Sequence, residues 1–281
     1  MTVGFIVPGP GGDGTWVDGA LAARRLLADE GFATEVITGM PAAIPADWSV
    51  AVCHGGQYAG LAASPALGPA SLSSRVVIVS DAHVLPPGIS GVTEIDWGWP
   101  DAFFCAGFAA RELAGDGRAV VFVAGAAVPT QRSLVDAFLT GLLESGGRPL
   151  PVHVTYLPSF DDVATAREVV KDALGTGRPA LYVSSSDGAG AAALEVARAA
   201  GAPTVSFLRE PGEGETGAVV CDIPGTLAGL VRRAAGGEPL PPLVTLTLGS
   251  GQVGLRLGGG ASDAARVSAA RAARLLDGRA G

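Results

Sequence analysis

The sequence predicts an α/β protein with two doubly wound parallel-sheet lobes that face a cleft. Strand and helix patterns alternate along most of the 281 residues, and this alternation is typical of parallel sheets with helices on both faces. Several strand candidates are unbroken apolar runs, such as 75–80 and 119–124, which suits strands that are buried on both sides. One sheet that held every candidate would be unusually wide, so two smaller sheets are expected.

The expected elements follow in order along the chain. Strands are expected at residues 3–8, 33–38, 49–53, 75–80, 92–96, 118–124, 151–156, 180–184, 203–207, 216–221 and 243–248. Amphipathic helix patterns lie between them, at residues 15–30, 130–145, 161–175, 188–200 and 223–236. Apolar residues at helical spacing define each pattern.

Two expected chain crossings divide the sequence into lobes. The chain is expected to cross at Gly115–Gly117 and to return at 221–224. The first lobe then holds residues 1–114 and about 223–245, and the second holds 115–222 and about 246–260, followed by a C-terminal helix at 261–281. Ligands bind at the carboxyl ends of parallel strands, so the cleft is the expected site.

Composition excludes several classes of function. The net charge is −8 and basic residues do not cluster, so no nucleic-acid surface is expected. No apolar stretch is long enough for a membrane span.

Strand-like sequence begins at residue 2 with no leader before it, so a cytoplasmic protein is expected, or an exported one if a signal has been removed. Cys53, Cys105 and Cys221 are widely spaced and odd in number, which predicts buried free thiols.

Six segments carry a resemblance to a known family. They are GGDGTW at 11–16, VCHGGQYAG at 52–60, WPDAFFCAGFAARELAG at 99–115, VVFVAGAAVPTQRSLVDAFLTGL at 120–142, FDDVATAREVV at 160–170 and LYVSSSDGAGAAALEVARAAG at 181–201. Their order and spacing resemble the basic membrane protein family of purine-nucleoside receptors, a branch of the type I periplasmic binding proteins. The resemblance covers residues from about 3 to 223 and implies two lobes that close on a purine or nucleoside.

The sequence also departs from the family pattern. Family members use an aspartate after the strand near 203–207 and a lysine in the strand near 216–221 to hold the ribose. Here the nearest acid is Glu210, and Cys221 stands at the lysine position. The family's usual lipoprotein signal has no counterpart in this sequence.

The glycine-rich turn at 9–14 does not have the spacing of a dinucleotide-binding loop. Asp13 in that turn would repel a phosphate, whereas Trp16, at the start of the next helix, could stack on a flat ring. The resemblance places a base-stacking aromatic residue there. The alternative is that Trp16 packs beneath the helix.

The candidate ligand-binding residues lie at expected strand ends or in the turns that follow them. They are Asp13, Trp16, His54, Gln57, Asp96, Trp97, Trp99, Ser186, Asp187 and Glu210. Several also have a structural alternative: His54 as a satisfied structural residue, the two tryptophans at 97 and 99 as core or hinge packing, and Ser186 or Asp187 as a helix N-cap.

Neither a metal nor a cofactor is expected, because no zinc-ligand spacing is present, and no nucleophile elbow appears.

The leading hypothesis is a small-molecule binding protein for a purine, nucleoside or similar aromatic ligand. In the cytoplasm it would be a sensor or carrier, and a sensor would need a protein partner. The alternative is an enzyme that cleaves an N-glycosidic bond or modifies a nucleoside-like substrate. Asp13, Asp96, Asp187 and Glu210 would supply its acid and base, with no catalytic residue singled out. A third possibility is an effector domain that regulates transcription through a partner.

Overall fold

The computed structural model describes residues 1–63, 76–86, 89, 91–115, 119–147, 149–177 and 180–279. The chain divides into two compact units, Met1–Trp97 with Asp222–Leu246, and Gly98–Cys221 with Thr247–Gly281. A six-stranded sheet forms the centre of each unit. The predicted α/β class with two separate sheets is therefore confirmed.

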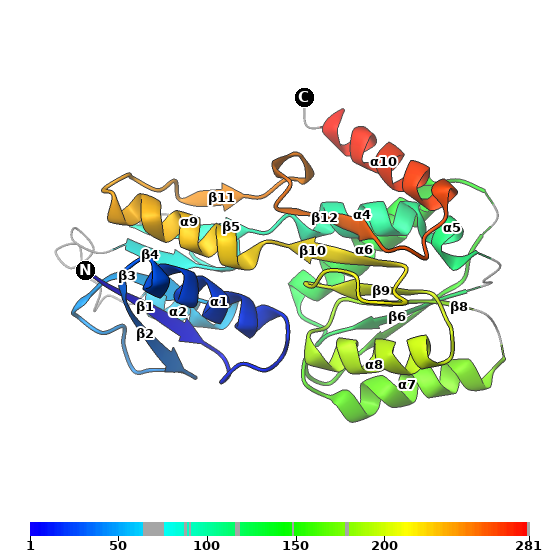
Figure 1. Cartoon of the computed structure of the whole chain (residues 1–281), viewed down its shortest axis with the longest axis horizontal. Helices are drawn as coiled ribbons and strands as arrows, with labels where there is room; N and C mark the ends of the chain where they lie inside the picture. The colour runs from blue at the N-terminus through cyan, green and yellow to red at the C-terminus, as the bar shows by residue number, and fades with distance from the viewer. Residues whose placement is uncertain are drawn as a thin grey trace. The chain divides into compact units, whose positions relative to one another are not determined.

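The first unit contains a wholly parallel sheet with the strand order β11-β5-β4-β3-β1-β2. Its strands are β1 (Thr2–Val7), β2 (Ala33–Thr38), β3 (Trp48–Cys53), β4 (Val76–Val79), β5 (Val92–Asp96) and β11 (Leu243–Thr245). Helices α1 (Trp16–Asp29) and α9 (Ile223–Ala235) lie side by side along this sheet (Figure 1). The short η1 (Gly56–Tyr58) and α2 (Ala59–Ala62) supply Tyr58 and Ala62 to a core with strand residues such as Ile6 and Val77.

The second unit contains a mixed sheet with the strand order β12-β10-β9-β8-β6-β7, in which only the β10–β12 pair is antiparallel among the described pairings. Its strands are β6 (Ala119–Ala124), β7 (Val152–Tyr156), β8 (Ala180–Ser184), β9 (Thr204–Phe207), β10 (Gly217–Cys221) and β12 (Val253–Leu257). Its helices are α4 (Trp99–Phe108), α5 (Ala110–Ala114), α6 (Pro129–Glu144), α7 (Val163–Gly175), α8 (Gly188–Ala199), the short η3 (Leu248–Ser250) and α10 (Asp263–Asp277).

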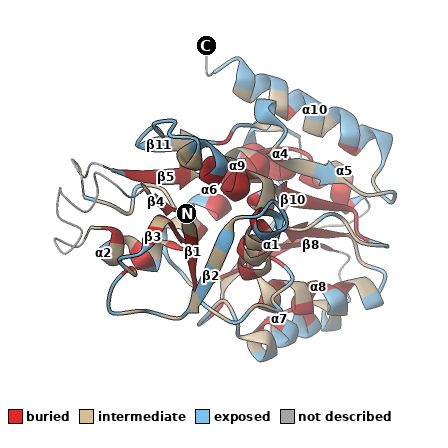
Figure 2. Ribbon diagram, turned by 60° about the vertical axis from the view of Figure 1, so that its left-hand side comes forward, coloured by how far each residue is buried: buried red, intermediate tan, exposed pale blue. Residues whose placement is uncertain are grey.

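Helices cover both faces of the second sheet. Helices α7 and α8 pack on one face, where Ala166, Val170 and Ala193 meet Val121 and Tyr182. Helices α4 and α6 cover the other face (Figure 1). Figure 2 shows that buried residues concentrate in the strands, whereas α7 and α10 turn exposed residues outward.

The first unit ends earlier than the sequence predicts, at Trp97 rather than at residue 114, because α4 packs against α6 and α10 of the second unit. Two helical glycines make the contact between α4 and α6 possible. A Cβ added at Gly107 would lie 2.7 Å from the carbonyl carbon of Phe138, and one at Gly141 would lie 2.9 Å from that of Phe104. Carbon atoms in contact normally stand about 3.5–4 Å apart, so only glycine fits at either position.

The sequence missed β12, whose antiparallel pairing with β10 gives the second sheet its edge. The expected C-terminal helix forms as α10 but belongs to the second unit. Arg75 and Arg118, the expected first residues of two strands, lie outside the described residues, as do Asp116 and Gly117 of the expected crossing.

All three cysteines are free, with Cys53 and Cys105 buried and Cys221 only partly buried. Among the described residues, no helix is both long enough and apolar enough to span a bilayer.

Candidate functional site

The first unit gathers its candidate residues at the carboxyl ends of its parallel strands. Trp16 begins α1, which follows β1, and His54 directly follows β3. Ser80 and Asp81 follow β4, Asp96 ends β5, and Trp97 comes next. Parallel strands bring their carboxyl ends to one edge of the sheet. These residues therefore share one edge of the first unit.

The glycine-rich turn folds around the carboxylates of two of the protein's own residues, Asp13 and Asp18. Asp13 accepts hydrogen bonds from the amides of Thr15 (3.0 Å), Val17 (2.8 Å) and Asp18 (3.2 Å) at the start of α1. The carboxylate of Asp18 accepts hydrogen bonds from the amides of Gly12 (2.8 Å) and Gly14 (2.7 Å). Gly12 and Gly14 have φ values of 91° and 68°, a conformation that favours glycine. Because carboxylates already satisfy the helix N-terminus, Asp13, predicted as a ligand residue, has a capping role in this structure.

Trp16 lies in an aromatic cluster. Its ring stacks on the ring of His54, with centroids 3.8 Å apart and an interplanar angle of 25°. Its ring also meets Trp97 edge to face, with centroids 5.6 Å apart. Trp16 is partly exposed, whereas Trp97 is only 2% exposed. Of these three predicted residues, Trp16 is the one whose surface reaches solvent.

His54 has no exposed surface. Its Nε2 atom lies 2.8 Å from the carbonyl oxygen of Trp16, and its Nδ1 atom lies 2.8 Å from the hydroxyl of Ser80. A carbonyl oxygen can only accept, so Nε2 carries the proton and donates, while Nδ1 accepts from Ser80. Burial lowers the pKa of His54 to about 3. His54, predicted to contact ligand, instead lies beneath Trp16 as a neutral support.

Asp81 is a candidate that sequence reasoning missed. Its carboxylate accepts hydrogen bonds from the amides of Ala82 (3.0 Å) and Gly56. Burial, with added repulsion from the carboxylates of Glu94 and Asp96, raises the pKa of Asp81 to about 6. An acidic residue directly after the expected strand at 75–80 was the available signal, since it marks the carboxyl end of a buried strand.

The remaining predicted residues of the first unit differ in exposure. Asp96 is partly buried, and its backbone oxygen accepts a hydrogen bond from the amide of Leu246 at 2.8 Å. Gln57 is exposed in η1. The indole N–H of Trp97 donates to the carbonyl oxygen of Ser80 at 3.0 Å, so Trp97 is a packing residue tied to the end of β4.

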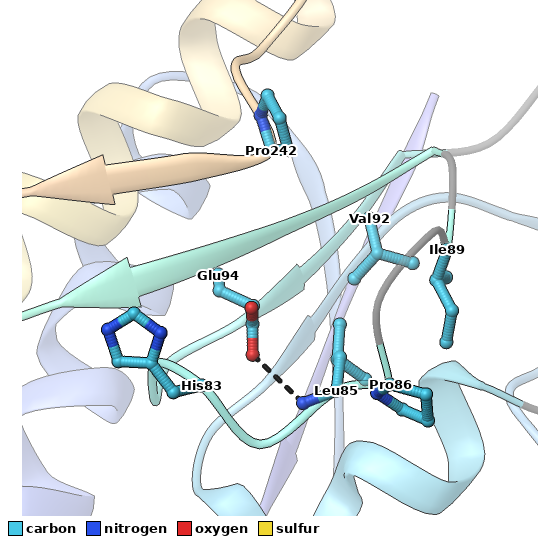
Figure 3. A pocket seen from close by; sticks show the side chains of 7 residues that line it. All are labelled: His83, Leu85, Pro86, Ile89, Val92, Glu94 and Pro242. Carbon is cyan, nitrogen blue, oxygen red and sulfur yellow. Dashed lines mark hydrogen bonds between the residues drawn. The ribbon is translucent and has the colours of Figure 1, made fainter.

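A depression of about 400 Å³ lies elsewhere in the first unit, lined by His83, Leu85, Pro86, Ile89, Val92, Glu94 and Pro242 (Figure 3). The carboxylate of Glu94 accepts hydrogen bonds from the amides of Val84 (2.9 Å) and Leu85 (3.1 Å) and so ties the loop after β4 to β5. Five of its seven lining residues are apolar, and none is a predicted site residue. Only two polar side chains, His83 and Glu94, line it, and Glu94 is already engaged by the amides of Val84 and Leu85.

The second unit has a buried polar network at its own carboxyl edge. The side chain of Gln131 donates to the carbonyl oxygen of Ser185 at 2.8 Å and accepts from the amide of Gly125 at 3.1 Å. The hydroxyl of Ser186 donates to the carbonyl oxygen of Phe160 at 3.3 Å, and Ser186 is 2% exposed. Asp187 is partly buried and stands at the N-cap of α8, without a side-chain capping bond. The network fixes the ends of β6 and β8 relative to each other.

Two predicted residues of the second unit lie in structural positions. Trp99 begins α4, is 9% exposed and meets the ring of Phe207 edge to face, with centroids 5.3 Å apart. Glu210 is exposed and forms an ion pair with Arg256 at 3.5 Å. An exposed ion pair contributes little to stability.

A buried carboxylate in the second unit was also missed. Glu215 is 1% exposed and forms ion pairs with Arg198, at 3.5 Å, and with Arg209. It also accepts hydrogen bonds from the hydroxyl of Ser206 (3.0 Å) and the amide of Gly212 (2.9 Å). These contacts hold the loop between β9 and β10. The residues before it, 210–214, are glutamate, proline and glycine, a composition typical of a solvated loop.

No group of three or more potential metal ligands occurs within the described part of the chain. The edge of the first sheet carries instead an aromatic ring, that of Trp16, and two partly buried carboxyl groups, Asp81 and Asp96. Such a combination can stack on a flat ring and accept hydrogen bonds from its donors.

The two six-stranded α/β units define the class: the chain has the type I periplasmic binding protein-like fold, which is the fold of solute-binding proteins. No protein-family model matches the sequence, and no curated protein matches it.

Solved structures match over nearly the whole chain. A transcriptional activator of the comK gene from Bacillus halodurans has a TM-score of 0.76 and 14% identity, over 98% of this chain and 97% of that one. A solute-binding protein of an ABC transporter system from Conexibacter woesei has a TM-score of 0.72 and 21% identity, over 99% of this chain and 97% of that one. A periplasmic solute-binding protein from Actinobacillus succinogenes, with bound D-allose, has a TM-score of 0.65 and 9% identity, over 87% of this chain and 95% of that one.

Proposed function

We propose that the protein binds a purine or a nucleoside. The observation that carries the proposal is Trp16, a partly exposed indole supported by His54 and Trp97 at the carboxyl edge of the first sheet. A flat ring that stacks on this indole would gain about 1–3 kcal/mol. A sequence resemblance to purine-nucleoside receptors supports the same ligand class.

The carboxyl groups at the same edge of the first sheet support a ligand with hydrogen-bond donors. Asp81 and Asp96 follow neighbouring parallel strands and can accept from ribose hydroxyls or from ring N–H groups. The raised pKa of Asp81 also lets it donate below about pH 6. The matched proteins include one with bound D-allose, so free sugars are the competing ligand class.

Calorimetric titration with adenosine, inosine, adenine, ribose and D-allose tests the proposal. Nucleosides should bind more tightly than ribose or allose, because only they offer both a flat ring and hydroxyl groups. Preference for a free sugar over every nucleoside and base would contradict it. Native mass spectrometry of freshly purified protein gives an independent view of what co-purifies.

We further propose a cytoplasmic role as a sensor or carrier, with a protein partner for a sensor. The three free cysteines support this proposal, because reduced thiols persist in a reducing compartment. Cell fractionation tests it, and recovery of the protein only from an exported fraction would overturn it.

An enzyme that cleaves N-glycosidic bonds is a second candidate, favoured by Asp81 alone. A carboxyl group with a pKa of about 6 is suited to general acid catalysis near neutral pH. Incubation with nucleosides, followed by chromatography for free base, separates this candidate from simple binding. Turnover that Asp81→Asn abolishes would support the enzyme, whereas binding without release of base would exclude it for these substrates.

A further inference from the structure

His54 and Ser80 are anchored to neighbouring strands by their backbones. The amide of His54 donates to the carbonyl oxygen of Ile6 in β1 at 2.8 Å, and the amide of Ser80 donates to that of Cys53 in β3 at 3.0 Å. Both side chains therefore start from fixed positions at the carboxyl edge of the first sheet. Ser80, like His54, is fully buried.

A chain of hydrogen bonds runs from Trp97 to Trp16 through these two residues. The indole of Trp97 donates to the carbonyl oxygen of Ser80 at 3.0 Å, and the hydroxyl of Ser80 donates to Nδ1 of His54 at 2.8 Å. Nε2 of His54 then donates to the carbonyl oxygen of Trp16 at 2.8 Å. With Nδ1 accepting, the neutral ring must carry its proton on Nε2. The carbonyl oxygen of Trp16 thus selects the tautomer, and the hydroxyl of Ser80 stabilises it by donating to Nδ1.

One imidazole constrains Trp16 in two ways. It holds the backbone carbonyl of Trp16 by a hydrogen bond, and its face lies against the indole at 3.8 Å between centroids. The hydrogen bond restricts the backbone at the start of α1, and the stacking restricts the direction of the indole. Together they determine which part of the indole surface remains exposed.

An apolar ring would fill the same space at a lower desolvation cost. Burying an imidazole is unfavourable unless both ring nitrogens have partners, and here each nitrogen has one. A fully satisfied buried network of this kind specifies one arrangement. The position of Trp16 is what this network specifies.

We propose that His54 and Ser80 are positioning residues that fix Trp16 at the carboxyl edge of the first sheet and thereby set the affinity for a flat ligand. The effect on affinity rests on the proposed function, but the position of Trp16 can be measured without any ligand.

The test combines three variants with two measurements. His54→Phe keeps a flat ring but loses both hydrogen bonds, Ser80→Ala loses only the hydroxyl, and His54→Gln keeps a donor that can reach Trp16. The indole ¹⁵N–¹H resonances of the four tryptophans, assigned with Trp→Phe variants, report the order of each ring. Adenosine titration of the same proteins reports affinity.

In His54→Phe the Trp16 resonance should broaden or split, while that of Trp48, elsewhere in the same unit, stays unchanged. Adenosine affinity should fall about tenfold, within the range that stacking on one aromatic ring supplies. His54→Gln should show a smaller change in both measurements. Thr93→Val is the matched control, since it removes a buried hydroxyl that donates to the carbonyl oxygen of Pro241 at 3.0 Å, and it should leave the Trp16 resonance unmoved.

A single Trp16 resonance at the wild-type position in folded His54→Phe would overturn the proposal. If His54→Phe does not fold, Ser80→Ala is judged by the same criterion. Wild-type affinity in a variant whose Trp16 resonance has split would overturn the link to affinity. If the wild-type protein does not bind adenosine, the proposed function fails for that probe, and the resonance still decides whether His54 and Ser80 position Trp16.

Discussion

Replacing Gly107 with alanine should destabilise the second unit, because α4 and α6 cross at this residue. The new Cβ would lie 2.7 Å from the carbonyl carbon of Phe138 and 2.9 Å from its Cα. Both atoms belong to the backbone of α6, so no side chain can rotate away to make room. The two helices would have to separate, and the separation would loosen the aromatic contact between Phe138 and Phe122, now 5.2 Å between centroids.

The magnitude follows from two opposing effects. Overpacking a buried site costs about 1–3 kcal/mol, and a backbone clash belongs at the upper end of that range. Alanine stabilises a helix by about 1 kcal/mol relative to glycine, which offsets part of this cost. The expected net loss is therefore about 2 kcal/mol, or about 4–8 °C in melting temperature for a domain of this size.

Thermal unfolding followed by circular dichroism measures this loss, and hydrogen exchange of the α4 and α6 amides locates it. Gly229→Ala is the matched control, since Gly229 is a helical glycine of α9 whose added Cβ would have no atom within 4 Å. That variant should be neutral or more stable by up to about 1 kcal/mol. Equal melting temperatures for Gly107→Ala and Gly229→Ala would refute the close packing of α4 on α6.

Three further predictions concern buried ionisable groups. The pKa of Asp81 is raised from 3.8 to about 6, so the folded protein holds a proton that the unfolded chain releases, and its contribution to stability should fall as pH rises from about 4 to 6. The pKa of His54 is lowered from 6.5 to about 3, so its contribution should fall as pH drops from about 6.5 towards 3. Urea unfolding of the wild-type protein, Asp81→Asn and His54→Gln at several pH values measures both pH dependences of the free energy of unfolding. Each substitution should remove the pH dependence assigned to its residue, and a dependence that remains would contradict that assignment. Glu215→Ala should cost about 3 kcal/mol, the lower end for a broken buried pair, because the two arginines are partly exposed. Glu238→Ala breaks an exposed pair and should leave the urea midpoint nearly unchanged. Equal urea midpoints for these two variants would contradict the buried role of Glu215.

The strand pattern was readable from the sequence because buried parallel strands need unbroken apolar runs. The runs at β4, β6 and β8 are of this kind, and all three strands formed within the expected ranges. β12 has the sequence VGLRL, in which glycine and arginine interrupt the apolar run, and so the sequence pattern did not predict this strand. The crossing of α4 on α6 depends on Gly107 and Gly141, which are far apart in sequence and signal a contact only when both helices are seen together.

The candidate site was only partly readable for a similar reason. Strand ends located Trp16, His54 and Asp96 at one edge of a sheet, since parallel topology brings strand ends together. Which of them would be covered depends on packing across strands, and so the full burial of His54 beneath Trp16 could not be foreseen. Asp81 was accessible to the same reasoning, because it directly follows the expected strand at 75–80.

Calorimetric titration of adenosine into the wild-type protein, Trp16→Ala and Trp16→Phe shows whether Trp16 stacks on the ligand. Trp16→Ala should weaken binding by about 1–3 kcal/mol, which is about 5-fold to 150-fold in Kd. Trp16→Phe should retain most of the affinity because a smaller aromatic face remains. The melting temperature of ligand-free Trp16→Ala should stay close to that of the wild-type protein, since the indole is partly exposed. Unchanged affinity in Trp16→Ala, or a loss of about 3–5 kcal/mol in stability typical of a core aromatic residue, would contradict the claim that Trp16 stacks on the ligand.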